Sequence, residues 1–265
     1  MAWVDRQAQY PLAACGSDLV SRCVKAQPAM PSASSELKVI FEDNHLLVID
    51  KPPLLATMGT QEGEDSLVER ARQYLKGKYN KPGNVFIGVV SRLDSFVTGV
   101  VVLARTSKAA SRLSEQFRSR TVEKKYWAII PDGLPSDSGQ LEDRLIKNES
   151  RHRMEVLRKN APKHPNEKLA RLRYRTIGRF SPINGERIRL IEVELETGRK
   201  HQIRVQFENV NCPIIGDQKY GSDLPFKRGI ALHSRELVIK HPTKQVSQSF
   251  QSDPPGWWNT GRFTL

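Results

Sequence analysis

The sequence predicts an α+β fold, with a mixed and largely antiparallel central sheet and flanking helices. Apolar, alternating runs come in pairs separated by turn residues, which is typical of hairpins. Stretches with apolar side chains three and four residues apart lie between these pairs and indicate helices. The 265 residues, of which 38% are hydrophobic, are enough for one sizeable core.

The first predicted elements are a hairpin and a helix. The segment LKVIFEDNHLLVIDKPP starts at Leu37 and has turn residues, Asp43 and Asn44, between two apolar runs. Residues 65–75 are expected to be helical because apolar side chains recur there at every fourth position. The turn-rich loop GKYNKPGN follows.

Two buried strands and a capped helix are expected next. The strands cover residues 85–90 and 100–103, and the loop before the second strand contains Gly99. Thr106 can accept a hydrogen bond at the start of a helix over residues 107–120.

Strands dominate the second half of the sequence. TVEKKYWAII is expected to be a strand, and residues 131–168 to be loops with one short strand. ARLRYRTIGRF and ERIRLIEVELETG should pair around the turn Asn184–Gly185, with a bulge between Leu190 and Ile191. RKHQIRVQFENV should be helical, and IALHSRELVIK should close the sheet.

The charge balance favours a polyanionic partner. The chain has 42 Lys and Arg against 29 Asp and Glu, so its formal net charge is +13. Such a surface attracts RNA or DNA. The alternating arginines of ARLRYR, at positions 171, 173 and 175, should form a basic strand face that binds RNA or is only solvated.

Several other classes of protein are disfavoured. The three cysteines, Cys15, Cys23 and Cys212, form no disulfide or zinc pattern and suit a reducing, cytoplasmic environment. No apolar run is long enough to span a membrane, and no signal layout is visible. The six histidines show no metal-ligand spacing, and phosphate-loop, dinucleotide and nucleophile-elbow motifs are absent. No metal and no cofactor is expected.

The best candidate for a catalytic residue is a carboxylate that lies between two apolar runs. Asp94 follows a predicted buried strand, and Arg92 lies two residues before it. A nearby guanidinium keeps a carboxylate ionised and fixes its direction. From spacing alone, this pair is either a structural ion pair or a held nucleophile.

Four stretches resemble the RluA family of RNA pseudouridine synthases, in the same order and spacing from Leu37 to Lys240. They are VIDKPPLLA, then SRLDSFVTGVVVLARTSKAASRLSEQFRSRTVEKKYWAI, then LETGRKHQIRVQF, and last PIIGDQKYG with ALHSREL. The departures from the usual pattern are Ser91 for His, Val97-Thr98 for Thr-Ser, Lys200 for Thr and Gln206 for His.

The resemblance implies catalytic roles for three residues. Asp94 would be the nucleophile, Tyr126 would stack on the target base and remove its proton, and Arg204 would pair with the aspartate. RNA contacts are expected for five basic residues: Arg92, Lys51, Lys124, Arg199 and Lys200. Lys124 shares a strand face with Tyr126, so phosphate contact and stacking can act together.

The expected function is therefore the isomerisation of specific uridines in structured ribosomal or transfer RNA to pseudouridine. One alternative is a non-catalytic RNA-binding or RNA-chaperone protein on the same fold. Another is a glycosidase, which would need a second facing carboxylate. A monomer without an obligate protein partner is expected, with an N-terminal extension over residues 1–36, a catalytic domain over 37–250 and a tail over 251–265.

Overall fold

The structure is a computed structural model that describes residues 37–59, 64–183 and 186–258. The predicted N-terminal extension and the predicted Asn184–Gly185 turn lie outside the described residues. No helix among the described residues is long and apolar enough to cross a membrane.

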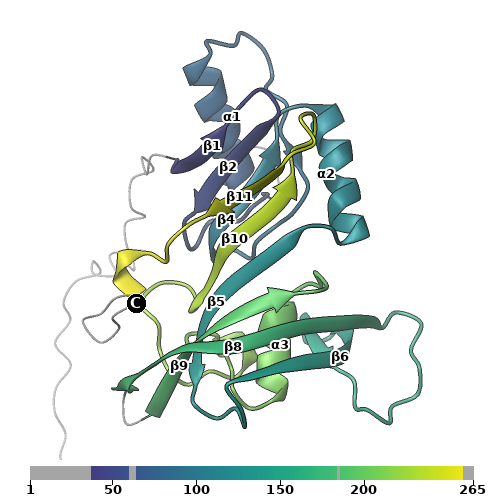
Figure 1. Ribbon diagram of the computed structural model, residues 1–265, viewed down its shortest axis with the longest axis vertical. Coiled ribbons are helices and arrows are strands. Elements are labelled where there is room, and N and C mark those ends of the chain that lie inside the picture. The colour runs from purple at the N-terminus through teal and green to yellow at the C-terminus, as the bar shows by residue number, and fades with distance from the viewer. Residues whose placement is uncertain (1–36, 60–63, 184–185, 259–265) are drawn as a thin grey trace, which may run out of the picture. The chain divides into compact units, whose positions relative to one another are not determined.

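The described strands form a single sheet of eleven members (Figure 1). They are β1 (Val39–Glu42), β2 (Leu46–Lys51), β3 (Gly88–Val89), β4 (Thr98–Ala104), β5 (Glu123–Pro131), β6 (Ser138–Asn148), β7 (Arg153–Val156), β8 (Lys168–Ile183), β9 (Glu186–Leu195), β10 (Leu232–Lys240) and β11 (Ser247–Gln251). Their order is β1-β2-β4-β10-β5-β9-β8-β6-β7, with β3 beside β4 and β11 beside β10. All pairings are antiparallel except that of β4 with β10. The predicted fold class is confirmed.

Helices cover both faces of the β1-β2-β4 part of the sheet. Side chains alternate along β4, so Val100 and Val102 pack with α2 (Ser107–Ser119), whereas Val101 and Leu103 pack with α1 (Leu67–Lys78). Both faces are therefore buried, which explains the continuous apolar run of β4. Figure 1 shows the two helices flanking these strands.

The third helix, α3 (Gln202–Asn209), packs on the other part of the sheet. Ile203 and Phe207 lie one turn apart and enter the apolar cluster formed by β5, β8 and β9. The predicted helix over residues 199–210 exists but starts three residues later. Short 3-10 turns follow at Gln218–Tyr220 and Gly256–Trp258.

Strand β10 joins the two parts of the sheet. It was predicted to close the sheet, but it lies in the interior, between β4 and β5. Only His233 and Ser234 pair with β4, at Thr98 and Gly99. Gly99 has φ +106°, and a Cβ there would lie 2.3 Å from the Ser234 carbonyl oxygen, so only glycine permits this close approach. The predicted loop around Gly99 is therefore wrong, since Gly99 belongs to β4.

Helix α2 confirms its predicted cap, since the Thr106 hydroxyl accepts from the Ala109 N–H. The bulge predicted beside Leu190 and Ile191 also exists, but the extra residue, Ile177, is on the partner strand β8. Trp258, in the predicted tail, is buried in the core cluster of β5, β8 and β9.

Two strand predictions need correction. Only Gly88 and Val89 of the predicted strand 85–90 pair with β4, while Val85 and Ile87 are buried without a ladder. Residues 131–168 hold the eleven-residue strand β6 and the strand β7. Charged side chains interrupt the sequence of β6, and its fully buried residue is Leu145. The segment therefore shows no clear alternation of apolar and polar residues that would predict a strand.

Candidate active site

Asp94 lies in the loop between β3 and β4, and its neighbours anchor that loop. The Leu93 N–H donates to the Thr57 hydroxyl oxygen at 3.1 Å, and the same hydroxyl donates back to the Leu93 carbonyl at 2.8 Å. The Val97 N–H donates to the Asp94 carbonyl and closes a tight turn. The Asp94 side chain retains 29% of its exposure, so a ligand can reach it.

Lys51 lies beneath this loop and is fully buried. Its ammonium donates to the carbonyl oxygens of Pro52 and Leu55 at 2.8 Å and of Ser95 at 3.1 Å. Burial lowers the pKa of Lys51 to about 7, against the opposing effect of the Asp94 charge. All three donors are used inside the protein, so the predicted contact of Lys51 with RNA is wrong. Lys51 instead joins loop 52–55 to loop 94–96.

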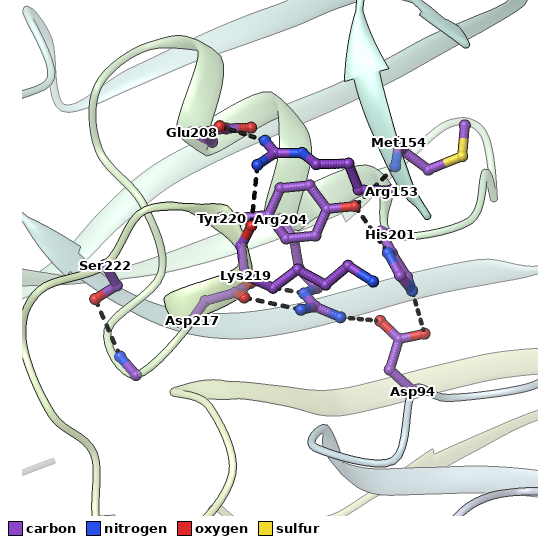
Figure 2. Close-up of polar contacts among 11 residues, drawn as sticks. Asp94, Arg153, Met154, His201, Arg204, Glu208, Asp217, Lys219, Tyr220 and Ser222 are labelled. Atoms are coloured by element: carbon purple, nitrogen blue, oxygen red, sulfur yellow. Dashed lines mark hydrogen bonds and ion pairs between the residues drawn. The ribbon is translucent and has the colours of Figure 1, made fainter. Parts of the chain in front are cut away.

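Arg204 connects two carboxylates from inside the protein (Figure 2). Its Nη1 lies 2.9 Å from Asp94 Oδ2, while Nε and Nη2 donate to both oxygens of Asp217 at 2.6 and 2.8 Å. Burial opposes the charge of Arg204, but the hydrogen bonds and charges of Asp217 and Asp94 raise its pKa. The predicted proximity of Arg204 to Asp94 is thus present in the structure.

His201 occupies the other side of the carboxylate. It precedes α3 in the left-handed backbone region, with φ +53°. Its Nε2 lies 3.6 Å from Asp94 Oδ1, and its Nδ1 lies 2.8 Å from the Tyr220 hydroxyl (Figure 2). Burial lowers the pKa of His201 to about 4, against the opposing effect of the Asp94 charge, and the charges of Arg204, Lys200 and Lys219 lower it further. The ring is therefore neutral at physiological pH.

Tyr126, on β5, faces the same cavity as Asp94. Burial raises the pKa of its phenol to about 12, an effect that the Asp94 charge reinforces and a hydrogen bond with Ser234 opposes. Its ring packs against the cluster of β5, β8 and β9. Tyr126 is therefore a neutral phenol that lines the same cavity as the carboxylate.

A cavity of about 440 Å³ joins these residues. Asp94, Tyr126, His201 and Arg204 line it together with apolar side chains that include Leu93, Val97, Ile203 and Leu232. This volume is typical of sites for small ligands. One carboxylate, one phenol and a neutral imidazole thus meet in a pocket that can take a single nucleotide.

The other four residues predicted to contact RNA either line the cavity or lie at its border. Arg92 is exposed and lines the cavity, as do Arg199 and the exposed Lys200. Arg199 also donates to the Leu169 carbonyl at 2.9 Å. Lys124 is half-buried, and its Nζ would lie 3.4 Å from a Cβ at Gly198, so it borders the cavity without lining it.

Three residues of this network received no role from the sequence: His201, Asp217 and Tyr220. The motif PIIGDQKYG carried the last two as a matched segment, and RKHQIR carried the histidine. The roles of these residues depend on the turn after α3, because this turn brings Asp217 and Tyr220 into contact with Arg204. Among the described residues, no three His, Cys, Asp or Glu side chains are grouped to hold a metal ion.

The sheet, helices and cavity agree with a class of RNA-modifying enzymes. A family model described as RNA pseudouridylate synthase matches residues 45–209. The chain belongs to this family, whose members are isomerases.

Curated relatives support the assignment. The chain is 31% identical over 232 residues to "Ribosomal large subunit pseudouridine synthase D" of Zymomonas mobilis, covering 83% of this chain and 69% of the relative. It is also 31% identical over 229 residues to "Dual-specificity RNA pseudouridine synthase RluA" of Haemophilus influenzae, covering 84% and 95%. The solved structure of "Human RNA Pseudouridylate Synthase Domain Containing 1" shares the fold, with TM-score 0.68 and 21% identity over 85% of this chain and 86% of that chain.

Proposed function

We propose that the protein isomerises specific uridines of ribosomal or transfer RNA to pseudouridine, with Asp94 as the nucleophile. The observation that carries this proposal is the position of Asp94, which is partly exposed in the cavity and paired to Arg204 at 2.9 Å. The names of the relatives, which act on ribosomal large subunit RNA or have dual specificity, support the substrate class.

The reaction requires no external reactant. The N1–C1′ glycosidic bond breaks, a C5–C1′ bond forms, and the proton on C5 is replaced by one on N1, so atoms and charge balance. A carboxylate can assist by forming a transient covalent bond, either at the ribose C1′ or at the base ring. The Arg204 guanidinium donates to this carboxylate at 2.9 Å and orients it.

Tyr126 is suited to hold the detached base. The uridine must leave its helix stack, which costs a few kcal/mol, and stacking on an aromatic ring recovers about 1–3 kcal/mol. Because the phenol is neutral, its ring offers an uncharged face to the uracil. A role in removing the C5 proton would require the phenolate form of Tyr126, which the hydrogen bond with Ser234 favours and which burial disfavours.

The glycosidase alternative lacks support from the site. Asp217 is the other carboxylate that Arg204 binds, but its side chain is 1% exposed and both oxygens are held. A glycosidase would need a second carboxylate facing the substrate. We also propose that the enzyme acts as a monomer, because Asp94, Tyr126 and Arg204 of one chain line the same cavity. A cytoplasmic location is proposed because the three widely spaced cysteines suit a reducing environment.

The decisive variant is Asp94→Asn, which removes the nucleophile and keeps the side-chain volume. We expect loss of pseudouridine formation in single-turnover assays on ribosomal and transfer RNA, with RNA affinity changed less than about threefold. The matched control is Asp253→Asn, whose carboxylate is 83% exposed and pairs with Arg235.

Mapping of pseudouridine in total RNA with and without the gene would identify the substrate. Loss of one or a few sites is expected. Unchanged activity of Asp94→Asn would contradict the role of Asp94 as the nucleophile, whereas an unchanged map would favour the non-catalytic RNA-binding alternative.

A further inference from the structure

Three large apolar side chains are exposed on the loops beside Asp94. Leu54 is 62% exposed, Met58 is 48% exposed and Phe96 is 45% exposed. Met58 lines the cavity, and Phe96 lies two residues after Asp94. We call these three residues the apolar rim. Exposed apolar surface next to a cavity marks a binding surface when the underlying backbone is fixed.

The backbone below the rim is fixed by several contacts. Lys51 binds both loops that carry Leu54 and Phe96, as described above. The Phe96 carbonyl accepts from the Ile230 N–H at 3.3 Å. Gly229 has φ +72°, and a Cβ there would lie 2.4 Å from the Phe96 oxygen. The side chains of the rim are therefore exposed from loops that are held in place.

The backbone conformation of Leu54 is a second indication that its exposed side chain has a function. Its φ is +63°, in the left-handed region that a leucine adopts only at an energetic cost. Strained residues of this kind concentrate at binding and active sites. Nothing within the loop needs a leucine there, since most of its side chain contacts solvent.

We propose that Leu54 and Phe96 form a platform that stacks on an unpaired RNA base next to the target uridine. The proposal rests on the proposed function, because turning one nucleotide out exposes the faces of its neighbours. The cations Arg92, Arg199 and Lys200 line the adjacent cavity, so the occupant should combine negative charge with a flat apolar face. An RNA base with its phosphates has both properties.

The test compares Phe96→Ala with Phe86→Ala. Phe86 is 50% exposed but lies beside Gly88 and Ala104, at the other end of β4. We expect Phe96→Ala to weaken binding of the RNA substrate about tenfold, Phe96→Trp to retain it, and Phe86→Ala to leave it unchanged. A 2-aminopurine placed beside the target uridine should be quenched on binding by the wild type and not by Phe96→Ala.

Equal affinity and equal quenching for wild type and Phe96→Ala would overturn the platform. So would a change in oligomeric state without a change in RNA affinity, because the rim would then contact protein. An inactive wild type would refute the proposed function instead, and the quenching measurement remains informative in that case.

An independent observation concerns the protons of His201 and Tyr220 (Figure 2). The Tyr220 hydroxyl oxygen accepts from the Met154 N–H at 3.1 Å. Within the described residues, the only acceptor for the hydroxyl proton is His201 Nδ1, at 2.8 Å. A neutral imidazole whose Nδ1 accepts must carry its proton on Nε2, which is the nitrogen facing Asp94.

We infer that His201 is a positioning residue that presents this Nε2–H to Asp94, and that the Met154–Tyr220 pair sets its tautomer. This inference also rests on the proposed function. Arg204 donates to Oδ2 at 2.9 Å, and His201 Nε2 lies 3.6 Å from Oδ1, a polar contact longer than a hydrogen bond, so the two side chains flank the carboxylate. Tyr220 is itself held between the guanidinium groups of Arg153 and Arg204, at 4.7 and 4.8 Å from its ring centre.

The test is Tyr220→Phe, which removes only the hydroxyl group. Nitrogen NMR of labelled histidine, assigned with His201→Gln, should show the His201 proton on Nε2 in the wild type and a mixture of tautomers in Tyr220→Phe. We expect kcat to fall about tenfold with KM unchanged. Tyr74→Phe, which removes a hydroxyl bonded to Glu42, is the matched control and should alter neither quantity.

A proton on Nδ1 in the wild type would overturn the inference. So would a Tyr220→Phe enzyme with the wild-type spectrum and kcat. A wild type without isomerase activity would leave the tautomer measurable and refute the proposed function alone.

Discussion

At the scale of single residues, the site depends on how the Arg204 guanidinium distributes its hydrogen-bond donors between two carboxylates. Arg204 gives two donors to Asp217, which is 1% exposed, and thereby aims the third at Asp94. A bidentate pair fixes the plane of the guanidinium. Asp217 therefore orients Arg204, and Arg204 orients Asp94.

Asp217→Asn is expected to reduce both stability and turnover. Removing the charge leaves the buried Arg204 without its main partner, so the free energy of unfolding should fall by about 3 kcal/mol. The kcat should fall about tenfold or more because Nη1 is no longer directed at Asp94. Denaturant unfolding and single-turnover rates well below the melting temperature would measure the two effects.

The comparison for Asp217→Asn is Glu142→Gln, which breaks an exposed ion pair with Arg171. Such pairs contribute about 0–1 kcal/mol, so neither quantity should move. A wild-type kcat in Asp217→Asn would contradict the role given to Asp217.

At the scale of elements, buried contacts between loops determine where the catalytic residues lie. Lys51 ends β2 and binds carbonyls of two loops that are more than forty residues apart, as the Ser95 contact shows. Thr197 and Gln202 shape the turn before α3, since the Gln202 side-chain oxygen accepts from both the Thr197 hydroxyl and the Arg199 N–H. This turn directs His201 and Arg204, three residues apart, to the same side of α3.

Lys51→Met should therefore destabilise the protein and impair catalysis together. The three carbonyl oxygens lose their donor, which is expected to cost about 2 kcal/mol. The loop of Asp94 loses its anchor, so kcat should fall while RNA affinity stays within about twofold. Thermal unfolding, turnover and RNA-binding measurements would report these effects.

Lys38→Met is the matched substitution for Lys51→Met, because the Lys38 side chain is 70% exposed and pairs with Asp50 at the surface. It should behave as the wild type. A strong loss of RNA affinity in Lys51→Met, with normal kcat, would contradict this prediction. It would support a direct contact between Lys51 and RNA, which the burial of Lys51 argues against.

At the scale of the whole molecule, the charge is distributed unevenly. The arginines of β8 do not form a free basic face, because Arg173 and Arg175 pair with Glu196 and Glu192, and Arg171 pairs with Glu142. The net charge of +13 must therefore act on RNA largely from other surfaces. Arg92, Arg199 and Lys200 line the cavity and form no ion pair with another described residue, so they are the natural place for phosphate contacts.

The stability of the whole protein should depend on pH through two buried histidines. Burial lowers the pKa of both His201 and His233 to about 4. Between pH 4 and 6.5 the unfolded chain binds protons that the native protein does not, so the free energy of unfolding should rise with pH across this window. We expect the change to be complete above pH 6.5, with an upper limit of about 7 kcal/mol for the two groups together.

Denaturant unfolding at pH 4.5 and pH 7 would measure this difference. His201→Gln should flatten the dependence in part, whereas the substitution of an exposed histidine, His164→Gln, should not. Equal stability at the two pH values would contradict the assignment of neutral, buried rings.

Local signals predicted most of the elements. The Thr106 cap, the hairpin of β1 and β2, and the helical spacing of α1 and α3 depend on residues close in sequence. Strand β6 could not be predicted, because its charged residues lie at a solvated sheet surface where pairing with β8 replaces apolar burial. The prediction of a loop at Gly99 is wrong because the conformation of this glycine depends on its contact with β10, which lies 135 residues later in the sequence.

By itself, the sequence determined the α+β class and the attraction to RNA, and the family resemblance of its motifs selected Asp94, Tyr126 and Arg204, which line one cavity in the structure. Periodicity, charge and motif order are properties of the chain, so they can be read without a fold. The tertiary structure alone decided that Lys51 is an internal link, that Asp217 and Tyr220 support Arg204 and His201, and that Leu54 and Phe96 are exposed beside the cavity. These facts depend on burial and on contacts between distant segments, and both arise only when the loops meet across the sheet.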